Sequence, residues 1–214
     1  MILDIKRVTS REVTLLLPYH YLIEESKGFR SGYNYGVYAN NTLQAVCIFH
    51  NPSVPELMKG CFGLKRNEQE GIFELGRLVR HPNLEKGFIL SQFVAGAIKS
   101  LRKDTKVKAL ISYADSRFHT GFIYQALNFR YYGLTKQRSD YWFEQPDGSF
   151  IKHTRGKVKG TKGEWRPRPR KHRYLMVYDN TLQVQWEEEP YPKADNINYI
   201  GDIGNGSRHI QEST

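Results

Sequence analysis

The stretch from Ile72 to Phe129 constrains the fold most, because strand-like and helix-like patterns of apolar residues alternate along it. "IFELGRLVR" is a strand closed by Pro82, and Leu90, Ala97 and Leu101 recur at helical spacing. "KVKALISYAD" is apolar enough for a strand covered on both faces, and "TGFIYQALNF" follows it as a short helix. This order predicts an α/β fold with helices on both faces of a central sheet.

The flanking segments add further strands and make the predicted sheet mixed in direction. Residues 31–50 are expected to form a hairpin that turns at Asn40–Asn41. Residues 11–22 are expected to form a short helix that Pro18 ends or redirects. Residues 131–143 supply a final strand or strand pair.

Ligands often bind an open α/β sheet where two neighbouring strands splay apart. We expect this point between the strand of Arg77 and the strand of Ser112, because a helix follows each of them at once. Arg77 lies among apolar residues, and a buried guanidinium needs an anionic partner. That partner is either a carboxylate, from Glu74 or Asp115, or an anionic group of a ligand.

Polar side chains are concentrated in "SYADSRFHTGFIYQALNFRYYG", residues 112–133, where a buried strand meets a helix. Hydroxyl, carboxylate, imidazole and phenol groups together at such a junction are typical of a site. The alternative interpretation is that these groups only cap the helix and pack against the sheet.

Two further places offer weaker candidates. Lys86 and Gly87 precede the helix at 87–101, whose first N–H groups favour an anion, although a plain turn is the alternative. Ser91 is either a capping residue or a site hydroxyl. His20 and Tyr21 are either a packed pair or, with a carboxylate, a ligand set that suits iron better than structural zinc.

Positive charge is concentrated late in the chain. Residues 152–173 hold ten Lys and Arg against one acid, whereas residues 180–214 hold two against six, within a total net charge of +10. Gly and Pro alternate with the basic residues, which predicts an extended strap rather than a helix, and the charge predicts that this strap binds nucleic acid. A charged loop without a partner is the alternative. The predicted DNA contacts are Lys157, Lys159, Lys162, Trp165, Arg166, Arg168, Arg170, Lys171 and Arg173.

The chain is expected to hold one catalytic domain, residues 1–179, followed by an acidic polar tail, residues 180–214, that is partly disordered or wraps the surface. Cys47 and Cys61 match neither a zinc spacing nor a disulfide framework. No signal peptide and no membrane span is predicted, so we expect an intracellular protein with no membrane partner. The oligomeric state stays open, with a dimer as one candidate.

Several motifs together resemble the bacteriophage Mom family of adenine-methylcarbamoylation proteins. They are "HYL", "ELGRLV", "SYADSRFHTGFIYQALNFRYYGLT", "KHTRG" and "RPRPRKHRY", in this order, from about His20 to Tyr178. The resemblance implies a GNAT-like N-acyltransferase fold and an enzyme that modifies the N6 amino group of adenine in DNA. It also implies a phage protein that acts in the host cytoplasm and shields phage DNA from restriction endonucleases.

The resemblance also implies roles for individual residues. Arg77, Ser91, Asp115 and Tyr124 match catalytic positions of the family. Positions proposed to hold iron or to line the pocket correspond to His20, Tyr21 and Tyr38. The loop after Asp115 is one residue shorter than is usual in the family. Acetyl-CoA is one candidate donor, with Ser91, Lys86 and Gly87 as its contacts, but the helix at 87–101 lacks a clean pyrophosphate signature.

Our hypothesis from the sequence is that Asp115, beside Tyr124, orients the N6 amine or accepts its proton. Ser91 would hold the donor, and Arg77 would balance charge behind it. The adenine would flip out of the duplex and stack on aromatic rings from residues 33–38. Two other classes stay open: a GNAT-like acyltransferase acting on a small amine or protein, and a non-catalytic DNA-binding module.

Overall fold

The computed structural model describes residues 4–20, 29–84, 87–152 and 160–193. Four of the predicted site residues therefore lie outside the described residues: Tyr21, Lys86, Lys157 and Lys159. The same holds for the tail from residue 194 onward.

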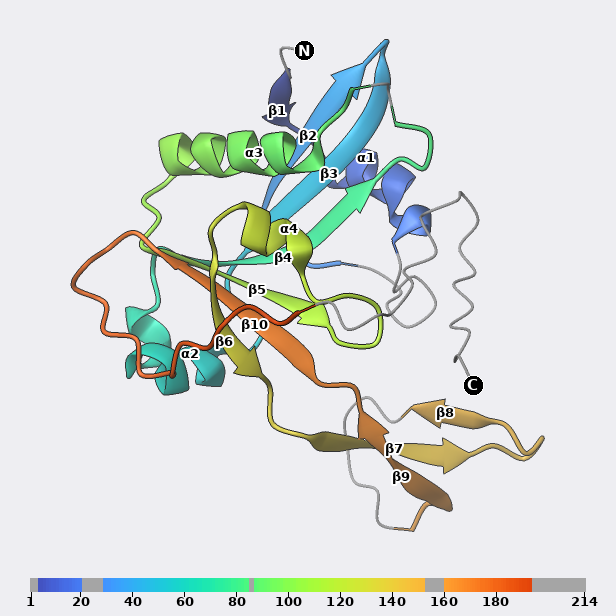
Figure 1. Cartoon of the computed structure of the whole chain (residues 1–214). Coiled ribbons are helices and arrows are strands. Elements are labelled where there is room, and N and C mark those ends of the chain that lie inside the picture. The colour runs from blue at the N-terminus through green and yellow to red at the C-terminus, as the bar shows by residue number, and fades with distance from the viewer. Residues whose placement is uncertain (1–3, 21–28, 85–86, 153–159, 194–214) are drawn as a thin grey trace.

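A seven-stranded sheet forms the centre of the molecule, with the strand order β1-β2-β3-β4-β5-β10-β6 (Figure 1). Its strands are β1 (Ile5–Arg7), β2 (Tyr33–Ala39), β3 (Thr42–His50), β4 (Ile72–Arg80), β5 (Ala109–Asp115), β6 (Arg130–Leu134) and β10 (Lys171–Val177). The neighbours β4 and β5 run parallel, and the other adjacent pairs of this sheet are antiparallel. The expected mixed sheet is therefore present.

Helices cover both faces of this sheet. They are α1 (Ser10–Leu16), the 3-10 turn η1 (Leu17–Tyr19), α2 (Pro55–Phe62), the 3-10 turn η2 (Arg66–Glu68), α3 (Leu90–Asp104) and α4 (Phe122–Ala126). Cys47 on β3 packs in the cluster beneath α3, whereas its neighbours Val46 and Ile48 pack with α1. Successive side chains of a strand point to opposite faces, so α3 and α1 lie on opposite sides. The predicted α/β fold is confirmed.

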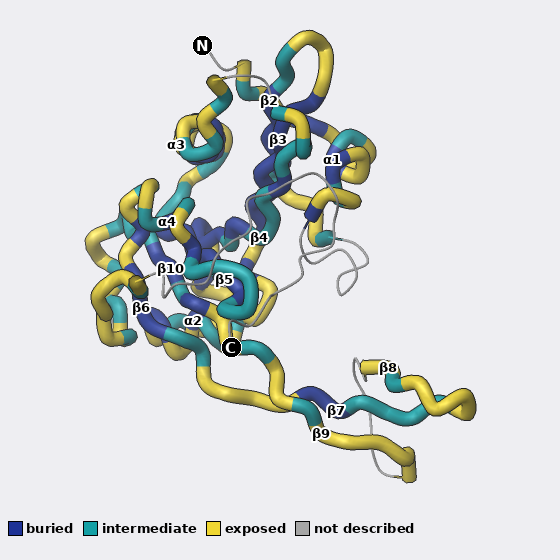
Figure 2. Tube along the Cα trace, turned by 45° about the vertical axis from the view of Figure 1, so that its right-hand side comes forward, coloured by how far each residue is buried: buried dark blue, intermediate teal, exposed yellow. Residues whose placement is uncertain are grey.

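The basic strap predicted from the sequence is divided between two sheets. Its last residues form β10, an interior strand between β5 and β6, so Lys171 and Arg173 belong to the central sheet. The preceding residues form part of a separate three-stranded sheet of β7 (Arg138–Glu144), β8 (Phe150–Lys152) and β9 (Gly163–Arg168). We call residues 136–170 the arm, because its described residues, 136–152 and 160–170, project from the body and are exposed along much of their length (Figure 2).

The expected final strand or strand pair at residues 131–143 is thus two strands in different sheets, β6 and β7. The sequence pattern did not separate them, because both segments have strand-like residues. What separates them is the pairing of β6 with β10, a strand that comes later in the chain.

The described part of the acidic tail, residues 180–193, lies along the body. The backbone N–H of Gln185 donates to the carbonyl oxygen of Cys61, and that of Glu189 donates to Tyr131. Trp186 packs with the apolar cluster beneath α2, and the Tyr191 hydroxyl donates to the carbonyl oxygen of Phe129 at 2.9 Å. No helix within the described residues is both long and apolar enough to span a bilayer.

Candidate functional site

The two parallel strands at the centre of the sheet part from each other halfway along. Their register runs from Ile72 opposite Ala109 to Leu75 opposite Ser112 and then stops. The buried Ser112 hydroxyl donates to the carbonyl oxygen of Leu75 at 2.9 Å. At the next residue, Gly76, β4 bulges against β3. The splay therefore lies between the Arg77 and Ser112 strands, as predicted.

A row of polar side chains crosses one face of the sheet at this splay. Ile111 and Leu175 pack with α2, and Ile48 and Val79 pack with α1. Alternation along each strand places the intervening polar residues on the same face, between these two helices. We call this row the polar band; it comprises His50 on β3, Glu74 and Arg77 on β4, Tyr113 and Asp115 on β5, and Lys171 on β10.

Lys171 lies at one end of the polar band, opposite Asp115 in the antiparallel register of β10 and β5. Lys171 is an exposed residue, but partial desolvation of its ammonium group lowers its pKa; the carboxylates of Asp115 and Glu74 act to raise the pKa, and the Arg77 guanidinium acts to lower it further. These opposing effects show that charges from β4, β5 and β10 act on one another across the band. Lys171 is thus a site cation as well as a residue next to the arm.

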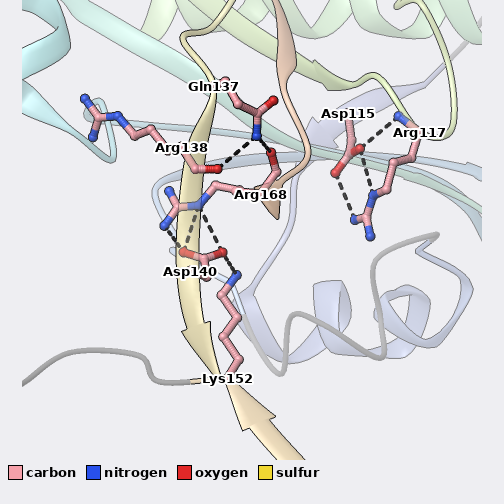
Figure 3. A network of polar contacts seen from close by, with 7 residues as sticks. All are labelled: Asp115, Arg117, Gln137, Arg138, Asp140, Lys152 and Arg168. Atoms are coloured by element: carbon pink, nitrogen blue, oxygen red, sulfur yellow. Dashed lines mark hydrogen bonds and ion pairs between the residues drawn. The ribbon is translucent and has the colours of Figure 1, made fainter. Parts of the chain in front are cut away.

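Asp115 is held firmly within the band, with only 4% of its surface exposed. Arg117 donates to it from the backbone nitrogen at 3.1 Å, from Nε at 3.2 Å and from a terminal guanidinium nitrogen at 3.1 Å (Figure 3). Such a two-pronged contact fixes both the charge and the orientation of a carboxylate. Asp115 is therefore suited to accepting a hydrogen bond from a positioned amine.

Tyr124 lies on the opposite face of the sheet, so the expected contact between Asp115 and Tyr124 is not found. Its ring packs on Phe129 and Tyr174, with centroid separations of 5.8 and 5.2 Å, in the cluster beneath α3. The loop after β5 carries the chain to α4 on that face. Nearness in sequence did not reveal this, because the two residues belong to different layers.

The start of α3 excludes the capping role for Ser91. The N-cap is Ile89, and no side chain caps the helix, so Ser91 is the second helical residue rather than the cap. Its side chain is partly exposed. Gly87 adopts φ +83° with open space around it. Uncapped N–H groups and a nearby hydroxyl can bind an anionic group of a donor.

Of the residues proposed to hold iron, Tyr38 makes a contact that opposes this role, and Tyr21 lies outside the described residues. The Tyr38 hydroxyl donates to Glu12 at 2.6 Å, and this hydrogen bond raises the pKa of Tyr38 to about 12. Tyrosine binds iron as a phenolate, so this contact opposes ligation. His20 is buried at the end of η1. Within the described residues, no three His, Cys, Asp or Glu side chains are grouped to hold a metal.

The contact between Tyr38 and Glu12 predicts an acid-sensitive helix start. Hydrogen bonds from Tyr38 and Thr9 lower the pKa of Glu12 from 4.5 to about 2. The stabilisation is therefore complete above pH 4.5 and is lost as the pH falls towards 2. We expect the urea midpoint of the wild type to exceed that of Glu12→Gln at pH 7, and the difference to shrink between pH 4.5 and 2. A pH-independent difference would contradict this. Glu56→Gln, an exposed carboxylate elsewhere, is the charge control.

The arm carries ten Lys and Arg against four Asp and Glu. Asp140 at its base binds both Arg168 and Lys152, the latter at 2.7 Å (Figure 3). Lys162 pairs with Glu144, and Arg166 pairs with Glu164. Several predicted DNA-contact residues therefore also hold the arm together.

Other predicted contacts present cations or a ring to the outside. Arg170 is exposed, although its guanidinium donates to the carbonyl oxygen of Thr135 at 2.7 Å. Trp165 is 63% exposed and stands edge-on to Tyr141. Arg173, in contrast, lies over the ring of Trp186 on the body. The arm thus offers both charge and an aromatic surface to a partner.

The model of the Mom protein family matches residues 2–193. The chain belongs to the Mom protein family. The match includes the whole central sheet, the arm and the described part of the tail. A comparison with curated proteins finds no match.

Solved structures similar to this Mom-family chain are acetyltransferases, at low identity. One, from Bacillus subtilis in complex with CoA, has 14% identity and a TM-score of 0.46, over 83% of this chain and 99% of that one. The ribosomal-protein-S18-alanine N-acetyltransferase from Escherichia coli has 11% identity and a TM-score of 0.47, over 83% and 95%. A polyamine N-acetyltransferase from Drosophila melanogaster has 9% identity and a TM-score of 0.48, over 83% and 100%.

The strand order of this Mom-family protein, with one parallel pair that splays at its middle, is the GNAT-like fold that the resemblance implied. Of its polar band, only Arg77 and Asp115 were catalytic candidates from the sequence. His50 follows Val46 and Ile48 at strand spacing, which could have placed it on their face. Lys171 was recognised only as a DNA contact, because its pairing with β5 is not visible in the sequence.

Proposed function

We propose that this protein is a DNA-modification enzyme that converts the N6 amino group of adenine in duplex DNA to a methylcarbamoyl derivative. The observation that carries the proposal is the direct connection of a basic arm to a polar site. The arm ends at Arg170, and the polar band begins at the next residue, Lys171. DNA held by the arm would thus lie beside the splayed strands. Membership of the Mom family supports this function.

The two faces of the sheet suggest a division of labour. The polar band would bind the acceptor base, with Asp115 accepting a hydrogen bond from the N6 amine and Arg77 and Lys171 balancing the charge. Ser91 and the start of α3 would hold the donor, and Tyr124 lies on that side of the sheet. A helix N-terminus suits an anionic group of the donor. The donor must carry its leaving group on the methylene carbon, because an acyl-CoA thioester alone would transfer an acyl group to N6 instead of a methylcarbamoyl group. Iron enters none of the proposed steps, because the contact of Tyr38 with Glu12 opposes ligation by that tyrosine.

The N6 amine is a poor nucleophile, since its lone pair is delocalised into the ring. The electron pair of the amine must form the new N–C bond. At the same time the bond between the transferred carbon and the donor's leaving group breaks, and the leaving group takes that electron pair. The amine loses one proton in this step, and a base of the site accepts it. Charges fixed around the reacting atoms stabilise this change more than water would.

The test is mass spectrometry of nucleosides from plasmid DNA of cells that express the protein. We expect part of the adenine to carry the mass of a methylcarbamoyl group, and the plasmid to resist restriction. An acetyl group differs from it in composition by an NH group, so the spectrum separates the two transfers. Unmodified adenine in the presence of folded protein would contradict the proposal. Cells that express Asp115→Asn serve as the control and should show little modification.

A further inference from the structure

A hollow of about 290 Å³ lies at the ends of β2 and β3, beside the polar band. Its lining includes Arg30, Ser31, Tyr33, His50 and Phe73. This volume lies at the small end of ligand pockets and suits one planar ring system rather than a whole cofactor. The lining combines two aromatic rings, one cation at the rim and one imidazole.

The aromatic wall is held in place from both sides. Tyr33 and Phe73 meet edge to face, with ring centroids 5.5 Å apart and planes at 83°. The Arg7 guanidinium lies over the ring of Tyr33, 4.6 Å from its centroid. The other two tyrosines of β2 form hydrogen bonds away from the hollow: the hydroxyl of Tyr35 donates to Asp104, and that of Tyr38 donates to Glu12. Tyr33 is therefore the tyrosine of β2 that lines the hollow.

The hydrogen bonding of His50 fixes which nitrogen can accept a proton or a hydrogen bond. Its Nδ1 lies 2.7 Å from the carbonyl oxygen of Asn51, which can only accept, so Nδ1 carries the hydrogen. In the neutral ring, Nε2 is therefore an acceptor. Nε2 has no hydrogen-bond partner among the described residues, and 6% of the His50 surface is exposed.

Gly76 leaves room for this nitrogen beside β4. A Cβ at position 76 would overlap Nε2 of His50, the nearest atom to it. Gly76 is also the bulged residue of β4, directly after the last pair that joins β4 to β5. His50 thus joins the hollow to the polar band, and any side chain at position 76 would obstruct that junction.

We propose that this hollow receives the flipped-out adenine and that Nε2 of His50 accepts a hydrogen bond from its N6 amino group. The inference rests on the proposed function and identifies the part of the site that recognises the base. A lone pair at this position favours bases with an amino group. It repels O6 of guanine and O4 of thymine, which are also acceptors. His50 is then a residue that determines specificity, and Tyr33 and Phe73 supply the ring contacts.

The test uses 9-ethyladenine and 9-ethylhypoxanthine as probes, which carry an amino and an oxo group at C6. Their binding to the full-length protein is measured by NMR titration. We expect the wild type to prefer 9-ethyladenine by about 10- to 100-fold, because the oxo group leaves Nε2 facing another acceptor. His50→Ala should reduce this preference to about twofold or less. Tyr33→Leu should weaken the binding of both probes to the same extent. His81→Gln, outside the hollow, is the control.

Two results would overturn the inference: equal or undetectable binding of both probes by the wild type, or an undiminished preference in His50→Ala. Gly76→Ala is a second variant, which should weaken the binding of 9-ethyladenine without removing the imidazole. Thermal melts verify that each variant folds. The proposed function fails separately. If wild type and His50→Ala modify plasmid adenine equally, the function stands and the pocket is wrong. If the probes behave as expected but adenine in DNA stays unmodified, the function is wrong and the pocket stands.

Discussion

Replacing Lys171 by methionine is expected to lower the rate of adenine modification by about 10²- to 10³-fold, the usual cost of removing one positioned charge from a site. DNA affinity should change by less than about threefold, which is about the loss of a single phosphate contact. The reason is position: Lys171 is exposed, but it lies opposite Asp115 in the register of β10 and β5, and the charges of Asp115 and Glu74 act on it. Methionine keeps most of the volume and removes the cation.

Rates from timed nucleoside mass spectrometry and affinities from fluorescence anisotropy together decide this prediction. Lys103→Met is the matched control, because it removes an exposed cation from the last turn of α3. The opposite pattern would contradict this prediction. A large loss of DNA affinity with little loss of rate at saturating DNA would show that Lys171 is a DNA contact, as predicted from the sequence. A thermal melt of both variants excludes unfolding as the cause.

The elements from Ile72 to Phe129 could be predicted because local spacing determines them. The apolar positions of β5 form a continuous run, and those of α3 recur with helical period, so both patterns are visible without any partner. The splay point followed from their order. Phe93, Ala97 and Leu101 are fully buried, as helical spacing requires of the face that packs on the sheet.

The layer that each site residue occupies could not be predicted, because it depends on pairing between distant segments. Tyr124 and Asp115 are close in sequence, but one lies beneath α3 and the other faces α1 and α2. β10 enters the sheet between β5 and β6, so the strand after the arm completes the site. The bulge at Gly76 and the contact of His50 with it require the β3–β4 register, which no local pattern specifies.

Charge on the arm was visible in the sequence, but its distribution among ion pairs was not. Asp140, Glu144 and Glu164 each bind cations of the arm, so neutralising those cations would disturb the arm as well as DNA binding. A clean test therefore needs basic residues that form no ion pair with these acids. Lys136, Arg138 and Arg170 are exposed and meet that condition.

Changing these three residues together to glutamine is expected to weaken binding to duplex DNA by about 10- to 100-fold near physiological salt. Each phosphate contact contributes about 0.9 to the slope of log affinity against log salt concentration, so the slope should fall by about 3. The measurement is fluorescence anisotropy of a labelled duplex at several salt concentrations. Both quantities should change together, because both arise from the release of counterions.

The control removes the same charge from the far side of the body. Lys59, Lys65 and Arg66 lie on or near α2 and η2, away from the arm (Figure 1). Changing them to glutamine lowers the net charge equally, but should leave the salt slope nearly unaltered, because screening confines charge effects to about 10 Å. If both triple variants lose affinity and slope to the same extent, net charge alone attracts DNA and the arm is not its binding surface. If only the arm variant does so, DNA contacts lie next to Lys171, where the polar band begins.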